Sequence, residues 1–453
     1  MTEDFQKAAA LAAAYLDDVP YAPVWQPITE WDRAWLTDQP LPAAGRPLDV
    51  LLDEVRDYVL PYPMGTGHPR FFGWVNSPPS RAGVAVAPLA AALNPSTAGG
   101  EHSGVLLERT VVRWLAELVG FPHLPGGGIL TSGASMATII ALSAARRRAL
   151  PEVRETGMYG GPPLTMYLSA EGHSCLRKAA ELLGLGSDHL RTVPVDADHR
   201  MDVAELRRLV AQDREMGKRP FLVAASAGTV NTGAVDPLDA IAGVAREHGL
   251  WFHVDGAYGA LGTLVNPAAY AGMAEADSLA LDPHKWLGVP VDCGCLLVRD
   301  PSAPRDAFSL VPPYLRDDDA DDLGWFSEYT PEQTRPFRAL RVWATLANLG
   351  RDGVTDLVTR TTRLAARLGE MVVESDDFEL LAPVTTSIAA FRYTPAEVNA
   401  ALPVAVQRRG RAFLTGTVLN GEPALRACIL HPDTTETDLV VLLDEIRAAA
   451  KEL

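Results

Sequence analysis

The sequence predicts an α/β fold built around a mostly parallel sheet. Short apolar runs at residues 165–168, 221–225 and 251–254 are expected to be buried strands, and helical stretches separate them. Strands that alternate with helices indicate a parallel sheet, because two parallel strands can be joined only by a long crossover. At 453 residues and 47% hydrophobic content, the chain can bury a large core and is expected to divide into two or three domains.

The chain before and within this sheet divides into two predicted parts. Residues 1–80 are expected to form an N-terminal helical segment, with helices near 5–16 and 48–59 and a proline-rich connector between them. This segment has no compact core of its own in the sequence pattern. Residues 81–345 are predicted to form the large domain, to which residues 293–298 contribute a further strand.

The rest of the chain, residues 346–453, is predicted to be a small α+β domain. A long helical stretch is expected over 343–373, and the chain ends in an amphipathic helix over 436–452. Between them, strands are expected at 386–393 and 424–430. The sequence holds no internal repeat long enough to indicate a repeat array.

Composition narrows the classes of partner. The net charge of -17 disfavours nucleic acid and anionic membranes, since both bind clustered positive charge. The alanine-rich stretch 8–14 is too short for a signal peptide or a membrane span. The four cysteines show no paired Cys-x-x-Cys spacing, so we expect no metal site and a reducing compartment, the cytoplasm; they stand at positions 175, 293, 295 and 428. The acidic run 317–322 is expected to be a solvated loop.

The run Pro283-His284-Lys285-Trp286 is the most informative motif, because it places a lysine directly after an apolar strand-like segment. Enzymes that use pyridoxal phosphate (PLP) need an amine on a rigid element. That amine must also be partly desolvated, so that enough of it is neutral to attack an aldehyde. An isolated lysine is in most proteins an exposed surface charge. Lys285 is therefore a candidate Schiff-base lysine only together with the motifs around it.

Asp255 is predicted to stand at the carboxyl end of the strand over 251–254. Open parallel sheets bind ligands outside the carboxyl ends of their strands, so Asp255 and Lys285 are expected to converge on one crevice. A carboxylate there would keep the ring nitrogen of PLP protonated, which strengthens the ring as an electron sink. The alternative is that Asp255 caps a turn or a helix.

Two further turns lead into predicted helices. Gly133, Ala134 and Ser135 precede a helical run over 137–150, and the unsatisfied N–H groups of a helix start favour an anion such as a phosphate. His173 stands at the turn of another strand-turn-helix passage, where an imidazole can stack on a cofactor ring. The alternatives are an ordinary N-cap at the first turn and a hydrogen-bonded histidine at the second helix start.

Along the chain, the candidate motifs follow the order phosphate turn, histidine, aspartate and lysine, and Asp255 stands thirty residues before Lys285. This order resembles that of the group II PLP-dependent amino acid decarboxylases, the family of aromatic amino acid and glutamate decarboxylases. The likeness covers most of the chain, from residues 67–74 to residues 334–343. It implies PLP fold type I, which is aspartate aminotransferase-like. It also implies decarboxylation of an L-amino acid, aromatic as the first expectation, to the amine and CO2 through an external aldimine and a quinonoid. In this family the N-terminal segment wraps a second subunit, so the resemblance implies a homodimer.

The resemblance also implies a role for each matching residue. Lys285 would form the internal aldimine, Asp255 would pair with the pyridine nitrogen, and His173 would stack on the ring. Tyr314 falls on the loop tyrosine that protonates the carbanion in decarboxylating members. Further cofactor contacts are expected from Ala134, Ser135, Thr229, Ala257, Asp282 and His284, and substrate contacts from Trp74, Ser77 and His173.

Some positions depart from the family pattern and leave questions open. Asp282 stands where the aromatic enzymes usually carry asparagine, and a second anion beside a phosphate is repulsive unless it is paired or protonated. Val230 replaces a threonine found in relatives, so a hydroxyl contact to the cofactor is either missing or supplied by Thr229. Near the expected substrate pocket, several residues are smaller or more polar than a catechol or indole pocket requires, namely Val75, Asn76, Asn94 and Ser96.

Alternatives for the reaction therefore stay open at this stage. The substrate is an aromatic amino acid on the resemblance, with an acidic or aliphatic amino acid as the alternative. A PLP-dependent oxidative aldehyde synthase is the second function, although family members that make aldehydes tend to have lost either the histidine or the loop tyrosine. The third is a cofactor-bound scaffold without catalysis, which the complete set of catalytic residues disfavours.

Overall fold

The computed structural model describes residues 2–158, 160–310 and 323–453. These residues form two compact units. The first unit comprises Met1–Pro78, Arg363–Leu381 and Ser387–Leu453, and the second comprises Pro79–Thr362 and Ala382–Thr386. Tyr314 and the acidic run 317–322 lie outside the described residues.

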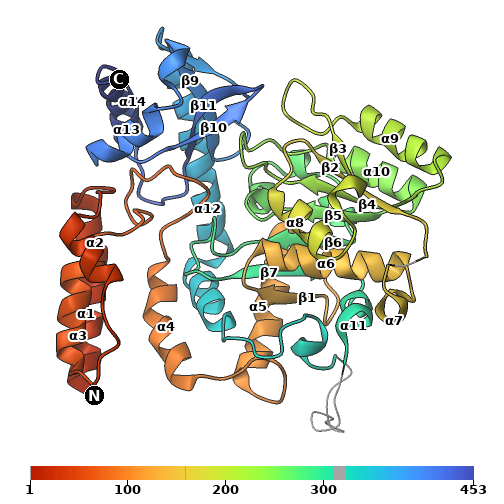
Figure 1. Ribbon diagram of the computed structural model, residues 1–453, viewed down its shortest axis with the longest axis horizontal. Helices are drawn as coiled ribbons and strands as arrows, with labels where there is room; N and C mark the ends of the chain where they lie inside the picture. The colour runs from red at the N-terminus through yellow and green to blue at the C-terminus, as the bar shows by residue number, and fades with distance from the viewer. Residues whose placement is uncertain (1, 159, 311–322) are drawn as a thin grey trace. The chain divides into compact units, whose positions relative to one another are not determined.

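The second unit is built on a seven-stranded sheet (Figure 1). In spatial order its strands are β1 (Gly128–Thr131), β7 (Gly294–Val298), β6 (Ser278–Leu281), β5 (Trp251–Asp255), β4 (Arg219–Ser226), β2 (Leu164–Ser169) and β3 (Leu190–Val193). Strand β7 is antiparallel to both of its neighbours, and the other neighbouring pairs are parallel. The predicted mostly parallel sheet is therefore confirmed. Strands β2, β4 and β5 are buried over nearly their whole length, as expected for a sheet covered on both faces.

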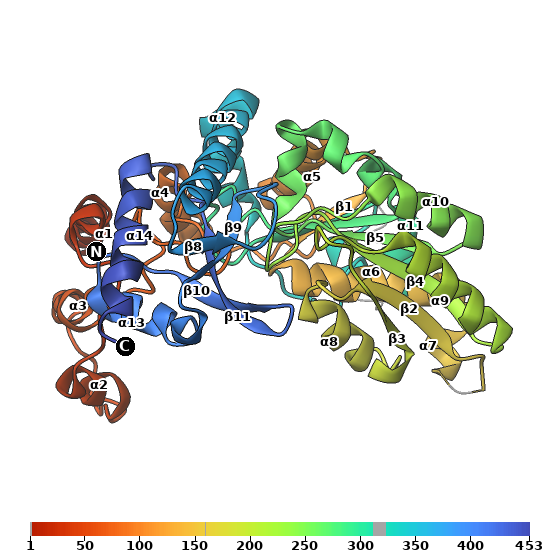
Figure 2. The ribbon, with the colours of Figure 1, turned by 90° about the horizontal axis from the view of Figure 1, so that it is seen from above.

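Helices cover this sheet. In Figure 2, α5 and α10 lie on one side of the sheet and α8 lies on the other. Helix α6 packs across β1, β4, β5, β6 and β7. It begins three residues before the predicted start, because Gly133 already serves as its N-cap. The helices of this unit are α4 (Arg81–Leu93), α5 (Ser103–Val119), α6 (Ala134–Ala149), α7 (Val153–Thr156), α8 (Ser174–Leu182), α9 (Val203–Glu215), α10 (Leu238–His248) and α11 (Ser302–Phe308).

The first unit contains a four-stranded antiparallel sheet. Its strands are β10 (Thr415–Leu419), β11 (Glu422–Cys428), β9 (Ile388–Tyr393) and β8 (Phe378–Leu380), with helices α13 (Leu402–Arg409) and α14 (Glu436–Ala450). The expected strands near 386–393 and 424–430 are present as β9 and β11. The structure adds β8 and β10, which the apolar pattern did not indicate. The long helix α12 (Ala339–Val373) runs from one unit into the other and contains a non-helical residue, Gly350.

The N-terminal segment belongs to the first unit and bonds to its C-terminal sheet. It carries α1 (Thr2–Asp18), α2 (Glu30–Thr37) and α3 (Leu48–Glu54), the last continued by a π-helical turn, Val55–Val59. The Phe71 ring stacks on Phe413 with centroids 4.8 Å apart, and the Cys428 N–H donates to the Phe72 carbonyl. The segment thus shares its core with the C-terminal strands. Among the described residues, none of the helices combines the length and the apolar character that a membrane span requires.

Candidate active site

The residues predicted for the cofactor site meet at one edge of the large sheet. Asp255 ends β5, the turn with Asp282 and Lys285 follows β6, and His173 follows β2. The parallel strands β2, β4, β5 and β6 end at the same edge, where ligands bind in open α/β sheets. All of these residues belong to the second unit. Asp255 and the Lys285 turn thus follow neighbouring parallel strands at this edge.

Lys285 is held in a tight, anchored turn. Its N–H donates to the Asp282 carbonyl at 2.9 Å. The next residue, Trp286, is buried, stacks on Tyr258 with centroids 5.0 Å apart, and donates from Nε1 to Thr361 Oγ1 at 2.9 Å. The Lys285 side chain is 21% exposed. This is the rigid, partly desolvated position that a Schiff-base lysine needs.

Asp282 forms an ion pair with that lysine. Its Oδ2 lies 3.3 Å from Lys285 Nζ and 3.6 Å from His284 Nε2. Burial raises the pKa of Asp282, and the charges of Lys285 and His284 oppose that rise. Its second oxygen, Oδ1, has no hydrogen-bond partner among the described residues. The two oxygens of Asp282 therefore differ: Oδ2 lies beside the Lys285 ammonium group, and Oδ1 can still accept a hydrogen bond.

His284 is oriented by a backbone contact. Its Nδ1 accepts the Cys293 N–H at 3.0 Å, so a neutral ring carries its proton on Nε2. Burial lowers the pKa of His284, and the Asp282 carboxylate partly offsets this. Burial thus favours the neutral imidazole, which presents a donor on the side of Asp282.

The start of α6 faces His284 and Asp282. A methyl group placed on Gly133 would lie 3.4 Å from His284 Cε1 and 3.9 Å from Asp282 Oδ1. The first amides of a helix have no partner within the helix, and here they belong to Ala134, which is buried, and Ser135, which is exposed. Helix-start amides beside a neutral imidazole donor form a cradle that fits a phosphate. The unpartnered Asp282 oxygen at the same place is a further sign that a polar group belongs there.

Asp255 and His173 lie close together. Asp255 is 8% exposed, and its carboxylate accepts the Ala257 N–H at 3.1 Å. His173 caps α8 and accepts the Cys175 N–H on Nδ1 at 3.2 Å. A nitrogen of His173, the sulfur of Cys175 and an oxygen of Asp255 lie within 4.8 Å of one another. His173 and Asp255 are therefore close enough that both would contact one bound cofactor ring.

His173, Cys175 and Asp255 are residue types that can bind a metal ion, and the sequence did not indicate a metal site here. Burial raises the pKa of the Cys175 thiol to about 12, and the Asp255 charge adds to the rise. The thiolate is the form that binds metals, so a thiol that keeps its proton is a poor ligand. The cluster is better explained by the cofactor.

The remaining predicted residues fall in three places. Thr229 is buried at the sheet edge, and its hydroxyl bonds within its own turn, 3.0 Å from Thr232 Oγ1 and 3.1 Å from the Ala234 N–H. Trp74 and Ser77 belong to the first unit, where Trp74 is 45% exposed. Tyr314 lies outside the described residues.

A fully buried ion pair, Glu108–Arg335, supports the cradle and was not predicted. The Arg335 guanidinium lies 2.5 Å from Glu108 Oε1, and both side chains have no exposed surface. Glu108 also accepts the Leu130 N–H at 3.0 Å, and Arg335 donates to the Leu130 carbonyl at 2.6 Å. The pair therefore braces β1, the strand that leads into Gly133. No local pattern could join two residues 227 positions apart.

Comparisons with known proteins agree with this geometry. Residues 32–394 match the family described as the pyridoxal-dependent decarboxylase conserved domain. The chain is 33% identical to an aromatic-L-amino-acid decarboxylase of Bacillus atrophaeus, over 85% of this chain and 82% of the relative. It is 31% identical to the human acidic amino acid decarboxylase GADL1, over 95% of this chain and 86% of the relative.

Solved structures give the same result. Mouse CSAD superposes with a TM-score of 0.92 at 27% identity, covering 99% of this chain and 98% of that chain. Oryza sativa TDC with PLP and tryptamine superposes with a TM-score of 0.91 at 26% identity, covering 100% and 97%. The expectations of fold type I, of the cofactor and of the enzyme class are thereby confirmed. The chain belongs to the family of PLP-dependent amino acid decarboxylases, which are carboxy-lyases.

Proposed function

We propose that the chain decarboxylates an aromatic L-amino acid to the corresponding amine and CO2. The observation that carries the proposal is the convergence of Lys285, Asp255 and His173 at one sheet edge, with His173 and Asp255 within 4.8 Å. The similarity to the Bacillus atrophaeus aromatic-L-amino-acid decarboxylase supports the aromatic class. Relatives named as acidic amino acid and L-2,4-diaminobutyrate decarboxylases match at 31% identity, so substrate class needs a direct test.

Each residue of the site has a defined task in this proposal. PLP supplies an electron sink for the electron pair that remains when CO2 leaves. Lys285 would hold the aldehyde carbon, His284 with the Ala134 and Ser135 amides would hold the phosphate, and Asp255 would hold the proton of the ring nitrogen. The Ala257 N–H bonds to the Asp255 carboxylate at 3.1 Å, which would keep that carboxylate in one orientation. Loss of one such electrostatic partner commonly costs about 3 kcal/mol of barrier.

Proton delivery to the substrate is assigned to Tyr314. Its hydroxyl would give a proton to the alpha carbon after CO2 has left, and exclusion of water and oxygen at that moment suppresses side reactions. The Cys175 thiol remains protonated beside Asp255, because burial raises its pKa to about 12, and it therefore adds no second negative charge there.

A product screen tests the substrate class. The purified protein is incubated separately with each proteinogenic amino acid, and amines, aldehydes and CO2 are measured by mass spectrometry. Lys285→Ala serves as the matched control for uncatalysed product. We expect amine and CO2 from phenylalanine, tyrosine or tryptophan. Turnover of aspartate or glutamate alone would reject the aromatic class and leave the decarboxylase assignment in place.

An oxidative aldehyde synthase is the second candidate, since an Arabidopsis thaliana phenylacetaldehyde synthase is 31% identical over 86% of this chain. The presence of both His173 and Tyr314 favours the amine product instead. Aldehyde, ammonia and peroxide in place of amine would establish this alternative. For Tyr314→Phe we expect the product ratio to move toward aldehyde, and an unchanged ratio would remove Tyr314 from proton delivery.

We also propose a cytoplasmic homodimer in which residues 1–80 wrap the partner subunit. The N-terminal segment exposes large apolar side chains, among them Phe5 at 61%, Trp31 at 76% and Leu41 at 94%. Apolar surface of this kind marks a contact region. The four cysteines are buried and free, as suits a reducing compartment. Light scattering after size exclusion should give the mass of two chains, and a monomer would contradict the proposal.

A further inference from the structure

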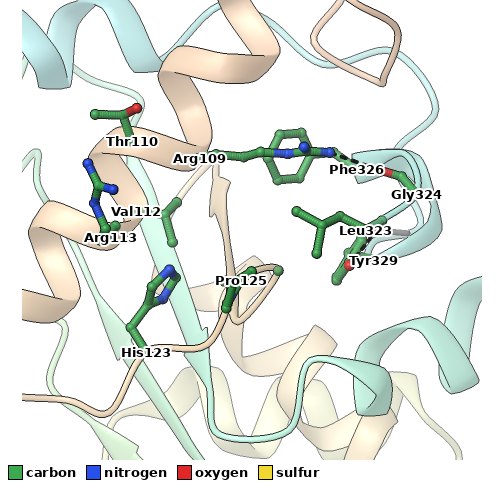
Figure 3. A pocket seen from close by; sticks show the side chains of 12 residues that line it. Arg109, Thr110, Val112, Arg113, His123, Pro125, Leu323, Gly324, Phe326 and Tyr329 are labelled. Atoms are coloured by element: carbon green, nitrogen blue, oxygen red, sulfur yellow. Dashed lines mark hydrogen bonds between the residues drawn. The ribbon is translucent and has the colours of Figure 1, made fainter. Parts of the chain in front are cut away.

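A cavity lies at the other end of β1 from the cofactor cradle. Its volume is about 330 Å³, and residues of α5, of the segment before β1 and of the stretch 323–329 line it (Figure 3). It reaches Gly128, the first residue of β1, whereas the cradle follows the last residue of that strand. None of the candidate active-site residues lines it. Its chemistry therefore calls for a separate explanation.

One side of the cavity is basic. Arg109 and Arg113 stand one turn apart on α5, and His123 comes from the segment before β1. Figure 3 shows Arg113 and His123 on the same side of the cavity, with Arg109 extending toward Gly324, to whose carbonyl it donates at 3.3 Å. No acidic side chain is among the described residues of the lining. In a chain with a net charge of -17, this local excess of positive charge is unusual.

The polar groups of this side retain capacity for a ligand. Arg113 pairs with Glu117 only at 3.8 Å, and both side chains are more than half exposed, so that pair contributes little. The Nδ1 atom of His123 is buried and has no hydrogen-bond partner among the described residues. A buried polar atom without a partner costs free energy, and a ligand that bonds to it recovers that cost.

The other side of the cavity is apolar. Figure 3 shows Leu323 and Phe326 across the cavity from Arg113 and His123, and Phe326 is only 5% exposed. Val112, 2% exposed, lies beside Arg113 and extends the apolar lining to that side. An apolar wall opposite a cluster of donors is the arrangement of sites that bind small organic ligands. An inorganic anion would bond only to the hydrogen-bond donors and would leave the apolar wall without a contact. The wall therefore indicates a ligand that also has an apolar body.

We infer that this cavity binds a small organic anion in which one carboxylate or phosphate group is attached to an aromatic or aliphatic body. The anionic group bonds to Arg113 and His123, and the body lies against Val112, Leu323 and Phe326. An ammonium group on the ligand would be repelled by the two arginines. The site therefore selects acids without an amino group, which separates its ligands from amino acid substrates and amine products.

The experiment is isothermal titration of the holoenzyme with 3-phenylpropanoate, with the neutral 3-phenylpropanamide as its matched analogue. We expect one acid bound per chain and no saturable binding of the amide. Arg113→Gln should weaken acid binding about tenfold, the loss expected for one charge-assisted hydrogen bond. Arg246→Gln, an exposed arginine outside the cavity, should bind like wild type. Phenyl phosphate should bind more tightly than inorganic phosphate.

Three results would overturn the inference. Equal binding of the acid and the amide would show that the basic side has no role. Equal binding of phenyl phosphate and inorganic phosphate would show that the apolar wall has none. Unchanged acid binding by Arg113→Gln, together with a change in the visible absorbance of the cofactor, would place the acid in the active site instead. Cofactor absorbance and circular dichroism of each variant report that it is folded.

Discussion

The carboxyl group of Asp282 is shared between Lys285 and the phosphate cradle. Its Oδ2 lies 3.3 Å from Lys285 Nζ, while Oδ1 faces Gly133 at the start of α6 and has no hydrogen-bond partner among the described residues. A charged carboxylate in this position would repel a phosphate, whereas a protonated carboxyl group would donate to it. Burial raises the pKa of Asp282, which favours the protonated form. The departure from asparagine at this position is therefore compatible with phosphate binding.

Asp282→Asn is expected to remove a pH dependence of PLP affinity. Because the pKa of Asp282 is raised, its neutral form persists to higher pH than in an ordinary carboxyl group, and affinity is lost as pH rises through that pKa. The amide of asparagine stays neutral and keeps a donor. The dissociation constant of PLP should therefore rise with pH more steeply in wild type than in the variant, by about tenfold for each pKa unit by which phosphate binding favours the protonated carboxyl group.

PLP binding to the two apoproteins is followed by quenching of tryptophan fluorescence across the pH range. Parallel pH profiles would show that Asp282 does not change its charge beside the phosphate.

Lys285→Ala is expected to lose the visible absorbance of the bound cofactor while remaining folded. The lysine side chain is 21% exposed, so its removal leaves the buried core around Trp286 intact. Far-ultraviolet circular dichroism and the absorbance spectrum are recorded on the same sample. A variant that keeps the wild-type visible band would exclude Lys285 as the Schiff-base residue.

The local parts of this site could be predicted from the sequence, because each depends on a short apolar run and the polar residue that follows it. The strand expected at 251–254 is β5, Trp251–Asp255, and it places Asp255 at the carboxyl end. Contacts between distant segments could not be predicted. The Glu108–Arg335 pair and the bonding of Phe71 and Phe72 with the C-terminal strands depend on topology, which carries no local signal.

Glu108→Gln is expected to destabilise the protein by about 3–5 kcal/mol, because it leaves the Arg335 guanidinium buried without a counter-charge. The pair braces β1, so PLP affinity should also fall. Replacing both partners, as in Glu108→Leu with Arg335→Met, should cost less than the sum of the single changes, since no buried charge remains. Urea unfolding measures the free energy of unfolding of the single and double variants, with the exposed Glu117→Gln as control. A single variant within about 1 kcal/mol of wild type would show that the pair is not needed.

His253 should make stability depend on acid pH. It is fully buried in β5, with Nδ1 2.8 Å from Ser278 Oγ, and burial lowers its pKa to about 4, an effect that the Asp255 charge partly offsets. In the unfolded chain its pKa returns to about 6.5, so the unfolded state takes up the proton first as pH falls. The stability that the neutral ring contributes is therefore present above about pH 6.5 and is lost progressively toward pH 4.

The expected loss for His253 is about 2 kcal/mol at about pH 5. Urea unfolding of wild type and His253→Gln at about pH 7.5 and about pH 5 measures it, because glutamine does not titrate. His68, whose pKa burial also lowers to about 4, titrates in both proteins and cancels in the difference. Wild type should lose about 2 kcal/mol more than the variant between the two pH values, whatever the cost of the substitution itself. Equal losses would mean that the ring at position 253 is already protonated, or solvated, in the folded protein.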